Sequence, residues 1–186
     1  MTEQTPKPER APVVWLTDLL LVAFLIGFDA VARLLPHAPG FMPIAASALF
    51  AGRVLRMPAL ALVVPIAAMA ISGMTMGPED WRIALVVYLA LALPALAGLW
   101  SRRWRGAAAV ATAMVPCSLA FFVMSNFAVW AFSGIYSLDG HGLVECYLAG
   151  LPFLQNTVCG DLFWCAALFG SAWLVQLLPA VAQRAR

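Results

Sequence analysis

Two polar segments in an otherwise apolar chain contain most of the side chains that could do chemistry. The first is R-L-L-P-H-A-P-G-F, residues 33–41, in which two prolines fix the backbone on either side of His37. An imidazole held in this way can act as a ligand or a proton acceptor. Asp29 lies four residues before Arg33, and side chains at this spacing share one face of a helix. We expect Asp29 and Arg33 to neutralise each other at a membrane boundary, where His37 could bind a ligand. The alternative is an interfacial cap in which Arg33 meets a lipid phosphate.

The second segment is residues 142–164, G-L-V-E-C-Y-L-A-G-L-P-F-L-Q-N-T-V-C-G-D-L-F-W. Asn156 or Thr157 could cap a helix that begins there, which places Asp161 near the positive end of the helix dipole. An acid with apolar neighbours inside the hydrocarbon region is by default a functional residue. Asn126, in F-F-V-M-S-N-F-A-V-W, is comparable. We expect Asn126 and Asp161 to face each other, either as a structural hydrogen bond or within a site.

Cysteine chemistry is the third candidate. Two of the four cysteines lie deep inside apolar runs and should pack as small apolar side chains. Cys146 and Cys159 fall near one membrane face and could form a disulfide. The chain has no C-x-x-C and no structural zinc spacing, which disfavours thiol oxidoreductase chemistry. Cys146, His37 and His141 could still serve as soft ligands to a metal centre, so the metal content stays open.

The elements that must position these side chains are transmembrane helices, because the composition excludes a soluble protein. Of 186 residues 63% are hydrophobic and 11% charged, with a mean hydropathy of +0.90. A soluble domain would carry roughly 25% charged residues. A net charge of +2 leaves no basic face for phosphates, so no nucleic acid is expected as a partner. No phosphate-binding loop or hydrolase motif occurs, and we expect no cofactor.

Six apolar runs bounded by proline, glycine or charged residues predict six transmembrane helices, at about 13–32, 41–55, 58–76, 83–100, 107–132 and 157–178. Residues 143–154 are apolar but short, and Pro152 interrupts them, so we predict an interfacial or re-entrant segment there. The expected fold class is therefore an all-α polytopic membrane protein. Its transmembrane domain is residues 13–180, with a disordered cytoplasmic tail at 1–12 and a cytoplasmic tail at 181–186.

The basic residues predict the orientation. Nine of the 11 fall on the side of the two termini: Lys7, Arg10, Arg53, Arg56, Arg102, Arg103, Arg105, Arg184 and Arg186. Only Arg33 and Arg82 fall on the other side, with both histidines and the acids of the connecting loops. The positive-inside rule then places both termini in the cytoplasm. We therefore expect a multi-pass protein of the bacterial cytoplasmic membrane with its polar chemistry facing outward.

Small residues four apart predict close helix packing, either within the bundle or against a partner subunit. The pattern occurs in three of the predicted helices: Ala23-x-x-x-Gly27, Ala48-x-x-x-Gly52 and Ala107-x-x-x-Ala111.

The polar segments resemble an uncharacterised family of small six-helix bacterial integral membrane proteins. Its marks are R-L-x-P-H-x-P-N-F, S-L-x-F-F-x-x-x-N-F-x-V-W and C-Y-x-x-x-x-P-F-x-x-N-T-x-x-G-D-L, which correspond to residues 33–41, 118–130 and 146–163. The chain departs from this pattern at Gly40, where the family has Asn, and at residues 72–73, where an acid is expected. The layout is similar to the substrate-binding S subunits of energy-coupling-factor vitamin transporters, including the solitary cobalamin-uptake type.

This resemblance implies a non-enzymatic subunit that captures a small molecule, such as a cobalamin, at the outer face for uptake. The implied partners are the lipid bilayer, the ligand and a transmembrane coupling subunit or a larger membrane complex. We expect the polar contacts to come from the two segments and the fifth helix: Arg33, His37, Asn126, Glu145, Cys146, Asn156 and Asp161. Trp130, Tyr136 and Tyr147 would form apolar walls. The alternative is a non-catalytic accessory or assembly subunit of a larger membrane complex.

Overall fold

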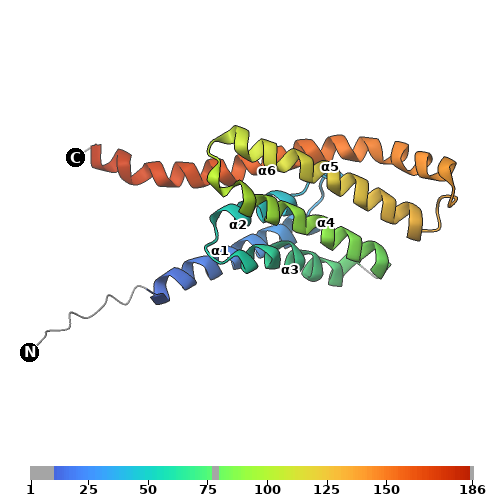
Figure 1. The fold of residues 1–186 in the computed structure, drawn as a ribbon. Coiled ribbons are helices and arrows are strands. Elements are labelled where there is room, and N and C mark those ends of the chain that lie inside the picture. Colours follow the sequence, from blue (N-terminus) through green and yellow to red (C-terminus); the bar gives the residue numbers. More distant parts are fainter. Residues whose placement is uncertain (1–10, 77–79, 185–186) are drawn as a thin grey trace, which may run out of the picture.

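The structure is a computed structural model that describes residues 11–76 and 80–184. These residues form helices joined by short connections (Figure 1): α1 Ala11–Leu34, α2 Ile44–Val54, α3 Pro58–Met76, α4 Trp81–Trp100, the 3-10 turn η1 Ser101–Arg103, α5 Ala107–Phe132 and α6 Gly140–Arg184. The described part of the chain contains no strand, so the predicted all-α class is confirmed there. Of the tails predicted at 1–12 and 181–186, residues 11–12 belong to α1 and 181–184 to α6, and the rest lie outside the described residues.

Four of the helices are long and apolar enough to cross a membrane. Their apolar stretches in α1, α4, α5 and α6 have 20, 23, 26 and 36 residues, with mean hydropathies of 1.9, 2.2, 2.0 and 1.6. A bilayer with a hydrocarbon core of about 30 Å needs about 20 such residues. Leucine, phenylalanine and valine side chains on their outward faces are exposed, as contact with lipid requires.

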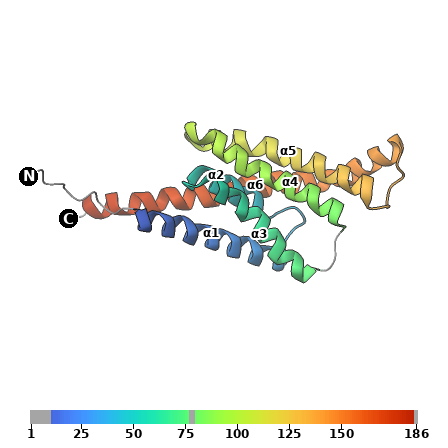
Figure 2. The same cartoon turned by 60° about the horizontal axis from the view of Figure 1, so that its bottom comes forward.

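Helix α2 is the central element of the bundle although it is the shortest helix. It contacts α1, α3, α4, α5 and α6, and eight of its 11 residues are buried. Its length is only about 16 Å, which is half of a hydrocarbon core of about 30 Å. The longer helices enclose it (Figure 2), so its ends need not reach the membrane surface. The helix predicted at residues 41–55 is therefore present, but as a half-length core helix.

Two glycines allow α2 and α4 to cross closely. A Cβ on Gly52 would collide with the carbonyl oxygen of Ala95, and a Cβ on Gly98 would collide with that of Leu49. The predicted packing role of the Ala48–Gly52 spacing is thereby confirmed. Gly27 on α1 is different, because a Cβ there would meet nothing within 4 Å.

The predicted break at residues 143–154 is wrong, because α6 runs without interruption from Gly140 to Arg184. This segment packs along the C-terminal half of α5, where the Tyr147 hydroxyl donates a 2.7 Å hydrogen bond to the Val123 carbonyl. Continuing the helix satisfies the backbone, and membrane helices tolerate a proline such as Pro152. The predicted helix cap at Asn156 or Thr157 is wrong for the same reason, since both lie mid-helix.

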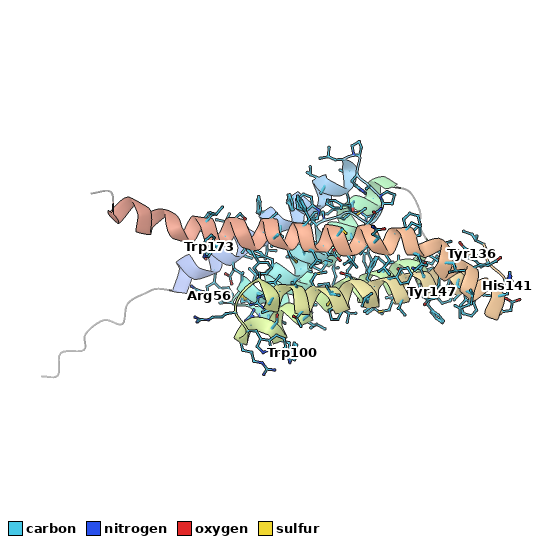
Figure 3. The ribbon with its side chains drawn as sticks, turned by 90° about the horizontal axis from the view of Figure 1, so that it is seen from above. Arg56, Trp100, Tyr136, His141, Tyr147 and Trp173 are labelled. Carbon is cyan, nitrogen blue, oxygen red and sulfur yellow. The ribbon has the colours of Figure 1, made fainter. Side chains whose placement is uncertain are left out.

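The start of α1 and the end of α6 lie at the same end of the bundle (Figures 1 and 2). Arg56, Trp100 and Trp173 mark this end, which we name the arginine end (Figure 3). Tyr136 and His141 mark the opposite end, which we name the histidine end.

Two arginines fasten α2 at the arginine end. Arg102 donates from Nε to the Gly52 carbonyl at 2.7 Å and from Nη2 to the Leu55 carbonyl. Arg53 donates in return to the Ser101 carbonyl at 2.7 Å and to the Trp104 carbonyl at 2.6 Å. Arg102 thus caps the orphan carbonyls of α2, and Arg53 holds the α4–α5 connection against it.

Candidate functional site

A cavity of about 280 Å³ lies above the first turn of α2, on the side of the histidine end. It is lined from all six helices and the α1–α2 loop, mostly by apolar side chains: Arg33, Gly40, Met42, Ile44, Ala45, Met69, Val87, Ala90, Leu91, Pro94, Cys117, Phe121, Phe153, Thr157 and Asp161. The cavity exists because α2 fills only half of the bundle, so its N-terminal turn becomes the floor. Pro94 also lacks the N–H that would bond the Ala90 carbonyl, which leaves an acceptor in the α4 wall.

Asp161 on α6 is the acid of this cavity. It is 3% exposed, and its Oδ2 accepts a 2.6 Å hydrogen bond from Ser118 Oγ on α5. A carboxyl group with a neutral hydroxyl partner in an apolar wall can accept from a ligand N–H or, when protonated, donate to a ligand oxygen. The expected partner Asn126 does not reach it. Asn126 Nδ2 donates to the Phe122 carbonyl of its own helix at 2.8 Å, and its amide lies against Gly150.

Arg33 lines the opposite wall, with Nη1 directed at the sulfur of Met69 at 2.8 Å. The expected Asp29–Arg33 pair is not formed. Asp29 instead accepts a 2.7 Å hydrogen bond from Ser47 Oγ and is fully buried, with Oδ2 lacking a hydrogen-bond partner. The reason is that α2 packs against the face of α1 that carries Asp29. Asp29 and Asp161 are therefore each bound by a serine of the neighbouring helix, whereas the buried Asp18 accepts from the backbone N–H of Arg56.

The α1–α2 loop, residues 35–43, packs against α6, with residues 35–39 exposed and residues 40–43 partly or fully buried. Asn156 Nδ2 donates to the Pro39 carbonyl at 3.1 Å, which fastens the loop to the middle of α6. Gly40 has φ +81°, and a Cβ there would lie 2.6 Å from Thr157 Oγ1. Phe41 packs its ring 5.4 Å from that of Phe163. The loop thereby closes one side of the cavity, and Asn156 positions it.

Other predicted site residues lie outside the cavity. His37 is exposed, and its Nδ1 lies 3.1 Å from the neighbouring Ala38 carbonyl. Glu145 is exposed near the histidine end and pairs with His141 at 3.6 Å. Cys146 is buried, with its sulfur 3.4 Å from the Asn126 carbonyl oxygen. The predicted aromatic walls are not among the lining residues either.

The predicted disulfide between Cys146 and Cys159 is wrong. Both are free and lie 13 positions apart on α6, a separation of about 20 Å along a helix. A disulfide needs Cα atoms within about 7 Å. Cys117 and Cys165 pack in the core as predicted. Among the residues that the structure describes, no three His, Cys, Asp or Glu side chains are grouped to hold a metal ion.

Sequence reasoning missed several residues of this site. Ser118 carries the hydrogen bond to Asp161, and its signal was its place in the S-L-x-F-F segment. Met69 and Pro94 also line the cavity, yet neither differs in sequence from an ordinary residue of an apolar helix.

Apolar helices long enough to cross a membrane, packed around a half-length core helix and a partly open cavity, define a helical membrane protein. The chain belongs to DUF6580, a family of unknown function, whose model matches residues 15–182. This agrees with the expected membership of an uncharacterised family. No curated protein and no solved structure matches the chain.

Proposed function

We propose that the protein is a substrate-capture subunit that binds a small molecule in this cavity for uptake across the bacterial cytoplasmic membrane. The observation that carries the proposal is the cavity itself, an apolar chamber inside the bundle with Arg33 and Asp161 in its walls. Pockets of this composition, with few polar groups on apolar walls, are typical of small-molecule sites. The proposal assigns binding and no catalysis.

The cavity volume limits the ligand. About 280 Å³ is just below the range of about 300–1,000 Å³ for ligand pockets, which favours a ligand far smaller than a corrinoid. Cys146 lies outside the lining, so a cobalt–thiolate contact is not part of the proposal. The preferred ligand has an apolar body, a group that Arg33 can bind and a hydrogen-bonding group that reaches Asp161.

In this proposal the chain crosses the membrane six times, with the α1–α2 loop and the half-length α2 together making the second crossing, and the arginine end is cytoplasmic. Nine of the 11 basic residues then follow the positive-inside rule, and the α1–α2 loop faces the outside. A ligand would enter from the histidine end and pass the segment that Asn156 holds.

The test is ligand retention by the full chain. The protein is purified in mild detergent, denatured, and its released small molecules are identified by mass spectrometry. A vitamin panel is then titrated against the protein in a thermal-shift assay. We expect a released compound and a matching stabilisation. Empty protein that binds none of the panel would contradict the proposal.

Matched variants locate the site. Ala90→Leu should fill the cavity and weaken binding at least tenfold, whereas Ala92→Leu, on the same helix but outside the lining, should leave it unchanged. Asp161→Asn should weaken binding while retaining the Ser118 hydrogen bond. Equal effects of the two alanine substitutions would place the ligand elsewhere.

A non-catalytic accessory subunit is the second candidate, and the outward face of α1 favours it. Ala23 and Gly27 are exposed, and Gly27 leaves room for the close approach of another helix. Co-purification in mild detergent separates the two functions. A stoichiometric complex with an ATPase supports capture for uptake, and a complex without one supports the accessory role.

A further inference from the structure

A second hollow, which we name the α5–α6 groove, lies at the arginine end. Its volume is about 630 Å³. Small residues line both sides, with Ala107 and Ala111 on α5 and Ala166 and Gly170 on α6, while Arg53 of α2 lies at its base. The spacing of Ala107 and Ala111 predicted helix packing, and in the structure both residues line this groove.

The groove has the length of one leaflet. On α6 its lining extends from Leu162 to Trp173, a rise of about 16 Å. Half of a hydrocarbon core of about 30 Å is about 15 Å. The groove therefore matches one leaflet in length, and Trp173 at one end of it is exposed at the arginine end (Figure 3). Tryptophan is typical of this interfacial level.

The charge at the groove is positive. Arg53 uses at most three of its five N–H groups for Ser101 and Trp104, which leaves two for another acceptor. Arg105 is exposed and directly precedes Gly106 of the lining. Neither α2 nor α5 contains an acid, and residues 162–175 of α6 contain none. An anionic headgroup is the complement of this distribution.

We propose that the α5–α6 groove binds one anionic phospholipid, with an acyl chain along the small residues and the phosphate at Arg53 and Arg105. The charge favours this occupant over an apolar partner helix, because Arg53 lines the groove, Arg105 adjoins it and no acid lies among its lining residues. The site is separate from the cavity above α2 and does not depend on its function.

The test uses the full chain in vesicles of equal phosphatidylglycerol and phosphatidylcholine. After extraction in mild detergent, native mass spectrometry counts the retained lipids. We expect one retained phosphatidylglycerol per protein and at least tenfold less phosphatidylcholine. Excess inorganic phosphate should not displace the lipid, because the acyl chain contributes most of the binding. Equal retention of the two lipids, or displacement by phosphate, would overturn the proposal.

Substitutions on α6 supply the matched control. Ala166→Leu projects into the groove, whereas Ala167→Leu places the same side chain one position away, on an exposed surface. We expect the first to reduce phosphatidylglycerol retention at least tenfold and the second to leave it unchanged. Gly170→Leu repeats the test at a position where an added Cβ meets nothing within 4 Å, so the substitution begins without a steric clash. Undiminished retention in this variant would contradict the proposal.

The charge is tested separately. Arg105→Gln should lower the preference for phosphatidylglycerol over phosphatidylcholine severalfold while an acyl chain is still retained. A preference equal to that of the wild type would show that Arg105 does not bind the phosphate. Capture of a protein whose binding Ala166→Leu abolishes, without any bound lipid, would assign the groove to a partner helix instead.

Discussion

At the scale of single residues, the buried acids are the most informative feature. Asp29 and Asp161 lie inside apolar helices, and each is bound by one serine hydroxyl from the neighbouring helix. A buried polar group without such a partner costs free energy, because no water replaces it. Asp161 differs from Asp29 in lining a cavity, which makes it the candidate for ligand contact.

Ser118→Ala removes the hydroxyl bound to Asp161. We expect a loss of about 1–2 kcal/mol in the free energy of unfolding, the range of hydrogen bonds between membrane helices. Unfolding in mixed detergent micelles measures it. Ser171→Ala is the control, since this exposed hydroxyl bonds only the Leu168 carbonyl of its own helix. Equal stability of the two variants would show that the Asp161 bond contributes nothing.

Gly40→Ala and Gly27→Ala should change the free energy of unfolding in opposite directions. Alanine at Gly40 must adopt φ +81° and collide with Thr157, so we expect destabilisation of more than about 1 kcal/mol. Alanine at Gly27 meets nothing and favours the helix by about 0.5–1 kcal/mol. Thermal unfolding in detergent compares them. A neutral Gly40→Ala would mean that the loop is not held against α6.

At the scale of elements, α2 and its two arginines determine the architecture. A half-length helix leaves four carbonyl groups exposed at its C-terminal end inside the bundle. Arg102 supplies donors to Gly52 and Leu55 there, so these loop charges do more than set orientation.

Arg102→Gln should destabilise the protein far more than Arg103→Gln. Arg102 makes two charge-assisted hydrogen bonds, each of the type that contributes about 1.5–3 kcal/mol. Arg103 only stacks on Trp100 and Trp104, which contributes about 0.5–1 kcal/mol at an exposed site. Thermal unfolding of both variants checks the order. Equal losses would show that α2 needs no cap.

The start of α4 should depend on pH through Asp80. Hydrogen bonds from the side chain and backbone of Arg82 lower the pKa of this carboxyl group from 3.8 to about 2. A lowered pKa in the folded state means that the charged group stabilises the helix start above about pH 4, and that this contribution is lost as the pH falls towards 2. Hydrogen exchange in the first turn of α4 should accelerate over that interval.

Asp80→Asn is the control for this effect. Asparagine still caps the helix but does not titrate. In this variant the rate of hydrogen exchange in the first turn of α4 should not rise as the pH falls from about 4 to about 2, apart from the pH dependence of the exchange reaction itself. An unchanged pH profile in the variant would assign the effect to another group.

At the scale of the whole molecule, the charges separate into two ends. The arginine end holds the α2–α3 and α4–α5 connections, the start of α1 and the end of α6, whereas the histidine end holds the α5–α6 turn (Figures 1 and 3). This is the arrangement that the positive-inside rule requires.

Single-cysteine variants test the orientation in a background without the four native cysteines. Leu138→Cys lies at the histidine end and is exposed, and Arg105→Cys is exposed at the arginine end. In intact cells an impermeant maleimide should label position 138, and position 105 only after permeabilisation. The reverse pattern would mean that the protein has the opposite orientation in the membrane, and equal labelling of the two positions would contradict the six crossings.

Most helix positions could be predicted from the sequence, because burial in lipid demands long apolar runs and these end at prolines and charges. The bounds predicted at 58–76 and 107–132 are those of α3 and α5. The break before residue 157 could not be judged in this way, because whether Pro152 ends a helix depends on what packs beside it. The Asn126–Asp161 contact failed because its prediction assumed that break.

The sequence by itself determined that the helices are apolar enough for lipid, where most of them lie along the chain, and that most basic residues gather at one end of the bundle. These properties follow from composition and from spacing along one chain. Only the tertiary structure decided that α2 is a core helix, that Ser118 and Ser47 bind Asp161 and Asp29, and that the loop at 35–43 packs against α6. Such contacts join residues far apart in sequence. Their geometry depends on which faces of the helices pack together, and single apolar helices with similar residues all round do not specify those faces.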